Sequence, residues 1–109
     1  MPKDLEISRL CDAYGALLTE NMLRTVRAYY DYDLSLAEIA EECGITRQAV
    51  LCRLRQAEGK LRELESAVGL VRKSDELLGK INAARLALET DADRGRSLLD
   101  GIITELSER

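Results

Sequence analysis

The chain of 109 residues contains no histidine, tryptophan or phenylalanine, and only one proline. Without histidine it lacks a common zinc ligand and the side chain best suited to acid–base chemistry at neutral pH. Its three cysteines, Cys11, Cys43 and Cys52, are odd in number and form no C-x-x-C pair, which argues against a zinc site or a disulfide framework. A glycine-rich phosphate loop is also absent. We therefore predict no enzyme: no catalytic residues, no metal and no cofactor.

Long apolar runs are missing as well. The N-terminal segment carries charges at Lys3, Asp4 and Glu6, so neither a signal peptide nor a membrane span is predicted. Free thiols suit a reducing compartment, and we expect a cytoplasmic protein. The cysteines are expected to be buried as small apolar residues, except Cys52, which the helical phase exposes.

What the chain has in abundance is helix-forming residues. Hydrophobic residues make up 46% of it, and the aromatics are four tyrosines. Apolar positions recur at three- and four-residue spacing, which predicts an all-α fold. The expected helices cover residues 4–18, 19–32, 36–42, 47–68, 71–89 and 92–107. We divide the chain into a helix-turn-helix domain, 1–69, and a C-terminal helical extension, 70–109.

The segment from Ser35 to Leu61 has the pattern of a helix-turn-helix. Ser35 and Glu38 form a capping-box pair, and Gly44 suits the left-handed turn that ends a helix. Thr46 is placed to cap the next helix. A small residue is needed where the two helices cross, and Ala40 occupies that place. The apolar residues expected to hold the pair together are Ile39, Cys43, Ile45 and Val50.

The helix that begins after Thr46 is expected to be long, because no strong helix breaker follows before Gly69. Its apolar positions are spaced four, three, four, three and four residues apart, like a coiled-coil seam. Gly59 weakens this helix by about 1 kcal/mol relative to alanine. The positions of the seam are Val50, Leu54, Ala57, Leu61, Leu64 and Val68.

The charge distribution is uneven. The net charge is −4, yet residues 46–62 contain five cations against one acid, Glu58. A local basic stripe on an acidic body suits a protein that presents one face to phosphates and binds them in a salt-sensitive way.

The helical phase indicates which residues of that stripe face solvent. With Val50 and Leu54 buried, Gln48, Cys52 and Arg55 point away from the core. Gln48 is suited to adenine, and Arg47 or Arg55 to guanine, whereas Arg53, Lys60 and Arg62 are expected to contact phosphates. The predicted nucleic-acid-binding residues are Thr46, Arg47, Gln48, Leu51, Cys52, Arg53, Arg55, Lys60 and Arg62. The competing interpretation is a packing or protein-docking module, since Leu51 and Cys52 are apolar and Glu58 repels phosphate.

The same residues resemble known proteins. The stretch from LSLAEIAEECGITRQAV through Leu61 is similar to the region-four helix-turn-helix of bacterial sigma factors. More narrowly, YGALLT (Tyr14–Thr19), the Tyr29-Tyr30 pair, DLSLAEIAEE (Asp33–Glu42) and TRQAV (Thr46–Val50) resemble the YlxM-like family of small bacterial proteins. The sigma resemblance implies nucleic-acid contacts at the exposed start of the second helix. The YlxM-like resemblance implies a regulator in the signal recognition particle pathway and no catalytic residues.

Two functional hypotheses stay open at this point. The first is a regulator that binds nucleic acid, with DNA favoured over RNA. The second is an accessory factor of the protein-targeting machinery that binds RNA or protein, without sequence-specific DNA binding. Signal recognition particle components are possible partners under either hypothesis. We expect a homodimer, and the alternative is a single chain whose C-terminal helices pack on its own fourth helix.

Overall fold

A computed structural model describes residues 4–108, which are helical with short connections and contain no strand. The all-α fold class is therefore confirmed, and the chain divides into two compact units, one ending at Val71 and the other starting at Arg72. The helices are α1 (Leu5–Tyr14), α2 (Glu20–Val26), α3 (Leu36–Cys43), α4 (Arg47–Val68), α5 (Leu70–Thr90) and α6 (Ala92–Ser107). A short 3₁₀ segment, η1 (Gly15–Leu17), and a π-helical segment, η2 (Arg27–Asp31), follow α1 and α2.

The predicted starting signals of the helices are confirmed. Thr19 accepts a hydrogen bond from the N–H of Met22 at 3.2 Å and so caps α2. Ser35 and Glu38 form the capping box of α3, each side chain bonding the other's backbone N–H at 3.1 Å. Each cap satisfies an N–H group that the first turn of a helix leaves free.

Glycine ends the two helices at which the sequence placed a stop. Gly44 follows α3 with φ 68°, and Gly69 follows α4 with φ 69°. A side chain with a Cβ is strained in this left-handed region, and glycine is not. The turn of the helix-turn-helix therefore depends on Gly44.

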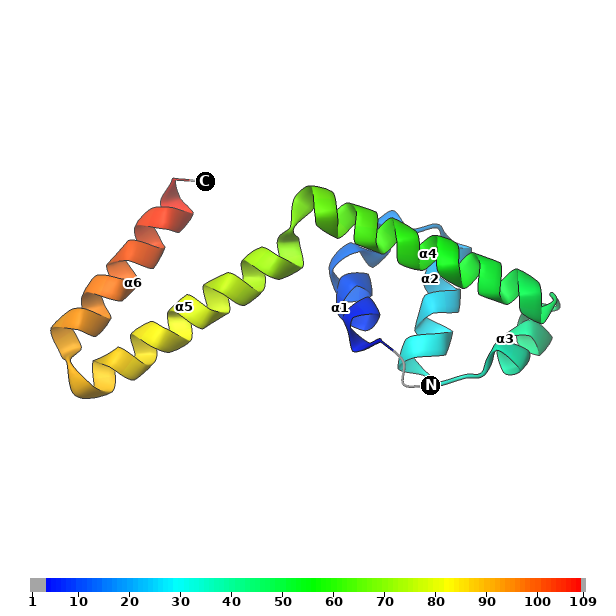
Figure 1. Ribbon diagram of the computed structural model, residues 1–109, viewed down its shortest axis with the longest axis horizontal. Helices are drawn as coiled ribbons and strands as arrows, with labels where there is room; N and C mark the ends of the chain where they lie inside the picture. Colours follow the sequence, from blue (N-terminus) through cyan, green and yellow to red (C-terminus); the bar gives the residue numbers. More distant parts are fainter. Residues whose placement is uncertain (1–3, 109) are drawn as a thin grey trace. The chain divides into compact units, whose positions relative to one another are not determined.

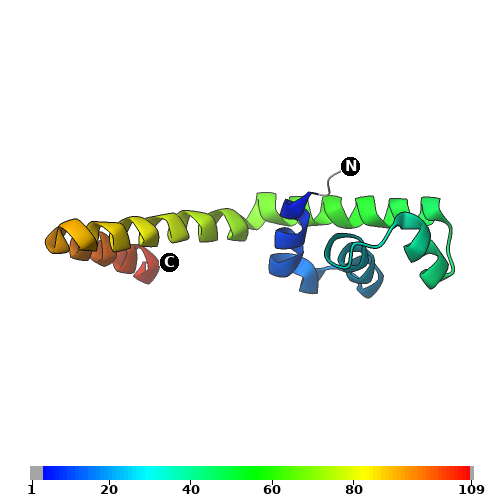
Figure 2. The same ribbon diagram turned by 90° about the horizontal axis from the view of Figure 1, so that it is seen from below.

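The core of the first unit lies between α4 and the three helices before it. Figures 1 and 2 show α1, α2 and α3 on one side of α4, and all three contact it. Within the predicted seam, Leu64 is only half-buried and Val68 is exposed, so the buried part of α4 is its first four turns. The buried hydrophobic residues of this unit are Ile7, Leu10, Cys11, Tyr14, Val26, Ile39, Ala40, Val50, Leu54, Ala57 and Leu61.

The helix expected over residues 19–32 differs from the sequence prediction in its last turn, which is π-helical. Arg27 at the start of this turn bridges Asp12 on α1 and Asp31, both at 2.7 Å. Ser8 also donates a hydrogen bond to Asp31 at 2.6 Å. The Ser8 hydroxyl, together with Arg27, holds the pKa of Asp31 below its usual value, and the two carboxylates raise the pKa of Arg27. This network joins the π-helical turn to α1.

The prediction that Cys43 helps to hold α3 and α4 together is wrong. Cys11 is buried and Cys52 is exposed, as expected, but Cys43 is exposed too. Cys43 is the last residue of α3, and the chain turns away directly after it at Gly44. Ile45, beyond the turn, packs against the buried cluster instead.

The buried hydroxyl of Tyr14 connects α1 to the junction of α4 and α5. It donates a hydrogen bond to Oε1 of Glu65 at 2.6 Å and accepts one from the N–H of Leu70 at 2.9 Å. The same Glu65 oxygen accepts from the N–H of Val71 at 3.0 Å. Two N–H groups of the first turn of α5, which have no partner within the helix, are satisfied in this way.

The second unit consists of the rest of α5 and α6, which run in opposite directions (Figure 1). Asp91 caps α6 through the N–H of Arg94 at 3.2 Å. Gly95 is buried close to Leu88, and Ala84 and Ile102 are the buried hydrophobic residues among the described part of this unit.

Candidate nucleic-acid interface

The side of α4 that faces away from α1, α2 and α3 is open to solvent. Gln48, Cys52 and Arg55 are exposed on it, whereas Val50 and Leu54 are buried on the opposite side. A helix bound on one side only can enter a groove with its other side. Among the described residues of the first unit, no helix lies on this side of the first turns of α4 (Figure 2).

The predicted contact residues divide by exposure. Leu51 and Arg53 are half-buried at the two flanks of α4. Thr46 uses its hydroxyl to accept the N–H of Ala49 at 3.0 Å, so its first role is structural. The exposed members are Thr46, Arg47, Gln48, Cys52, Arg55, Lys60 and Arg62.

A shallow hollow of about 520 Å³ lies on this open face. Gln56, one of its lining residues, is not among the predicted contacts, although it lies four residues after Cys52 and eight after Gln48, a spacing that places it near the same face of the helix. The hollow brings together four of the predicted nucleic-acid-binding residues, one of which is Arg55, and no described acidic residue lines it. Its lining residues are Gln48, Leu51, Cys52, Arg55 and Gln56.

The start of α4 is electropositive. Arg47, Arg53 and Arg55 lie within its first three turns, and within residues 4–108 none of them forms an ion pair. The N-terminus of a helix also carries a partial positive charge and unsatisfied N–H groups. Arg47 lies in the first turn, so its charge adds to that of the terminus, and Arg53 and Arg55 extend the positive charge along the next two turns.

The later part of α4 is less suited to phosphate than the sequence suggested. Arg62 lies seven residues beyond Arg55, which is about 10 Å along the helix axis at 1.5 Å per residue. Its guanidinium forms an ion pair with Asp4 at 3.1 Å. The structure therefore does not bring Arg62 into the cluster at the start of the helix. Glu58, the one acid of the stripe, accepts a hydrogen bond from the hydroxyl of Tyr30 at 2.5 Å. Burial and this carboxylate raise the pKa of Tyr30.

The described residues offer no group of three potential metal ligands. None of the helices in residues 4–108 is long and apolar enough to cross a bilayer. The chemistry that this surface supplies is hydrogen bonding and positive charge.

The arrangement of a capped short helix, a left-handed glycine turn and a long second helix is that of a helix-turn-helix. Residues 1–99 match the UPF0122 family, described as "Putative helix-turn-helix protein, YlxM / p13 like". The chain belongs to this family. The predicted resemblance to the YlxM-like family is thereby confirmed, and the matched region extends well beyond the motif into α6.

Two of the similar UPF0122 proteins align over nearly the whole chain, and a third aligns over a shorter part of it. One from Desulforamulus reducens is 39% identical over 108 residues, covering 95% of this chain and 92% of its own. Another from Symbiobacterium thermophilum is 39% identical over 105 residues, covering 94% and 98%. A third from Caldanaerobacter subterraneus subsp. tengcongensis is 43% identical over 77 residues, covering 71% of this chain and 66% of that protein. The similarity thus includes the C-terminal helices.

Proposed function

We propose that this UPF0122 protein is a non-enzymatic regulator that binds duplex DNA by placing the first turns of α4 in the major groove. The observation that carries the proposal is the open face of a helix-turn-helix within residues 4–108, where Gln48 and the unpaired Arg55 are exposed together, with the unpaired Arg47 at the start of α4 and the unpaired Arg53 at its flank. The three free cysteines suit action in the cytoplasm.

The residues of α4 divide into two roles in this proposal. Gln48 is placed to pair with adenine, and Arg47 or Arg55 with guanine, because these side chains bond two groups of one base edge. Arg53 and Lys60 bind phosphates at the rim of the groove, and Arg62 does so only after it releases Asp4. Leu51 and Cys52 contribute apolar contact, for example with a thymine methyl group.

The test is a fluorescence-anisotropy titration with labelled promoter fragments at low salt. Replacing both Arg47 and Arg55 with alanine is expected to weaken binding at least tenfold, because each good bidentate contact contributes about 1–3 kcal/mol. The matched control is Arg85→Ala with Arg96→Ala, which removes the same charge from exposed positions on α5 and α6. A wild-type chain that binds no duplex at low salt would refute the proposal.

The YlxM-like resemblance supports placing this regulator in the signal recognition particle pathway. The second candidate function is an accessory factor that binds RNA or protein of that machinery, and the acidic composition and amphipathic C-terminal helices favour it. Pull-down with the particle's RNA and with its GTPase separates the candidates. Retention by the GTPase that the two arginine changes leave intact would favour the accessory role.

We also propose a homodimer held through the C-terminal helices. Around the axis of α5, Ile81 and Leu88 lie within about 60° of the buried Ala84, both on the same side of it. Around the axis of α6, Leu106 and Ile103 lie within about 100° of the buried Ile102, in the same direction of rotation when each helix is viewed from its N-terminus. In antiparallel helices the same sense of rotation leads to the same side. Large apolar side chains therefore share one exposed side of the hairpin, and dimeric readers of this kind match two half-sites.

Light scattering tests the dimer. The intact chain is expected to show twice the mass of the monomer. The Ile81→Glu variant is expected to show the mass of the monomer, because an unpaired carboxylate is costly to bury in the interface. Leu86→Glu, on the far side of the same helix, is the control and should stay dimeric. A wild-type chain that is monomeric at every concentration would exclude a second copy as the partner of this face.

A further inference from the structure

A second hollow, of about 310 Å³, lies at the flank of α4 beside its open face. It is lined mainly by polar groups from three helices: Asn21 and Arg24 of α2, Glu42 and Cys43 at the end of α3, and Arg53 of α4. Arg53 is a predicted phosphate contact, whereas sequence analysis assigned nothing to Arg24 or Asn21. The fold thus adds polar groups of α2 to the flank of the recognition helix.

The charged side chains that line this hollow do not form ion pairs with other described residues. Within residues 4–108, neither Arg24 nor Arg53 forms an ion pair, and neither does Glu42. Two guanidinium groups against one carboxylate leave an excess of positive charge. An anion that binds in this hollow breaks no ion pair of Arg24 or Arg53 among the described residues.

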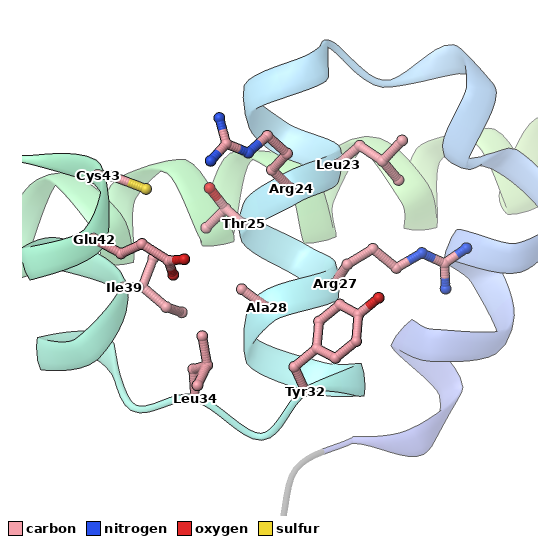
Figure 3. A pocket seen from close by; sticks show the side chains of 10 residues that line it. All are labelled: Leu23, Arg24, Thr25, Arg27, Ala28, Tyr32, Leu34, Ile39, Glu42 and Cys43. Carbon is pink, nitrogen blue, oxygen red and sulfur yellow. The ribbon is translucent and has the colours of Figure 1, made fainter.

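Arg27, three residues after Arg24 at the start of η2, is an arginine with a structural role in this protein. It is half-buried and bridges Asp12 and Asp31 at 2.7 Å. Figure 3 shows its guanidinium on one side of α2, whereas that of Arg24 extends to the other side, towards the end of α3 that carries Cys43. Arg24 is exposed and has no such carboxylate, so its charge remains available to a ligand.

We propose that Arg24 and Arg53, assisted by the amide of Asn21, bind a phosphodiester group of the duplex that α4 holds. This inference rests on the proposed DNA binding. With α4 in the major groove, a phosphate backbone borders each side of the helix, and the hollow lies along one of those sides. Backbone contacts of this kind position a protein on the duplex and carry no sequence information.

A purely structural role for Arg24 makes a different prediction. A cation near the C-terminal end of α3 stabilises that helix by interacting with its dipole. Removing the Arg24 side chain would then lower the melting temperature and leave the DNA affinity unchanged. The two roles are therefore separated by measuring melting and binding on the same variants.

The experiment titrates a fluorescein-labelled duplex of mixed sequence at several salt concentrations, since phosphate contacts are independent of sequence. The variants are Arg24→Ala, Arg53→Ala and, as the control, Arg85→Ala on α5. For Arg24→Ala we expect affinity to fall roughly fivefold or more at low salt, and the slope of log affinity against log salt to decrease by about 0.9, the loss of one phosphate contact. The control should match the wild type.

A parallel NMR titration follows the Nε–H resonances of Arg24 and Arg53 with inorganic phosphate as the probe. Wild-type binding to duplex with Arg24→Ala equal to the control would overturn this inference and leave the proposed function standing. Failure of the wild type to bind any duplex would overturn both. In that case, saturable shifts with inorganic phosphate would assign the hollow to a free phosphate group instead, and an absence of shifts would exclude an anion site there.

Discussion

The two compact units of this protein differ sharply in how they bury apolar side chains. The described part of the first unit, residues 4–71, encloses eleven hydrophobic residues, and several of them have no exposed surface. The described part of the second encloses only Ala84 and Ile102, while Leu78 and Ile103 remain 57% and 61% exposed. Helical segments of fewer than about 40 residues rarely bury enough surface to be stable alone.

The difference indicates what each unit needs. The helix-turn-helix unit has its own core and can hold the face of α4 rigid without help. The described part of the C-terminal unit leaves large apolar side chains exposed, and for this reason we propose that it serves association rather than recognition. The predictions below test this contrast.

The largest expected effect comes from the same substitution made in both units. Leu61→Ala, in the core of the first unit, should lower the free energy of unfolding by about 2–5 kcal/mol, because it removes packing and leaves a cavity. Leu86→Ala, at a position 65% exposed on α5, should change it by less than about 0.5 kcal/mol. Urea unfolding followed by circular dichroism measures both. Equal losses would contradict the contrast between the units.

A second prediction concerns the one crowded glycine of the C-terminal unit. A Cβ at Gly95 would lie 2.5 Å from the Leu88 side chain and 2.8 Å from its backbone nitrogen, and we expect Gly95→Ala to cost about 1–3 kcal/mol. Gly101→Ala on the same helix meets no atom within 4 Å and should stabilise α6 by up to about 1 kcal/mol. Thermal melting of the two variants compares them. A neutral Gly95→Ala would mean that α5 and α6 separate readily near their turn.

Two glycines of the first unit should respond to alanine with opposite signs. Gly44→Ala forces a side chain into a φ of 68° and should destabilise by about 1 kcal/mol. Gly59→Ala, inside α4 with open space around it, should stabilise by a similar amount. Chemical denaturation resolves the sign of each. The same sign for both would show that the turn at Gly44 is not held rigidly.

The smallest expected effect is a pH dependence of the first unit at Asp31. The pKa of Asp31 is lowered in the folded chain, so its ionised form favours folding. That contribution is present above the ordinary pKa of about 3.8 and is lost as the pH falls through the lower folded value. The melting temperature of Asp31→Asn should therefore lie below that of the wild type at neutral pH, and the two should converge in acid. If the two melting temperatures still differ at a pH below the folded pKa of Asp31, the difference has a cause other than the ionisation of this carboxylate.

Local signals in the sequence were enough to predict most of the fold. The caps at Thr19, Ser35 and Thr46 and the stops at Gly44 and Gly69 act within a few residues, so they can be recognised without tertiary information. They predicted the order of the helices, and the spacing of the apolar residues predicted the exposed face of α4.

Features that depend on distant residues could not be predicted in this way. The exposure of Cys43 follows from where the chain turns relative to α4, and the hollow that contains Arg24 forms only when α2 and α3 pack beside Arg53. The ion pair between Arg62 and Asp4 likewise joins residues 58 positions apart. The nucleic-acid contacts themselves remain predictions.

The hydrogen bonds at the start of α5 determine where this protein can be divided. A fragment that stops at Gly69 would deprive Tyr14 and Glu65 of the amide donors of Leu70 and Val71, even though Gly69 looks like the natural end of the helix-turn-helix. The minimal helix-turn-helix fragment should therefore extend at least through Val71. Trimming the gene at the apparent helix end would weaken the attachment of α1 to the rest of the core.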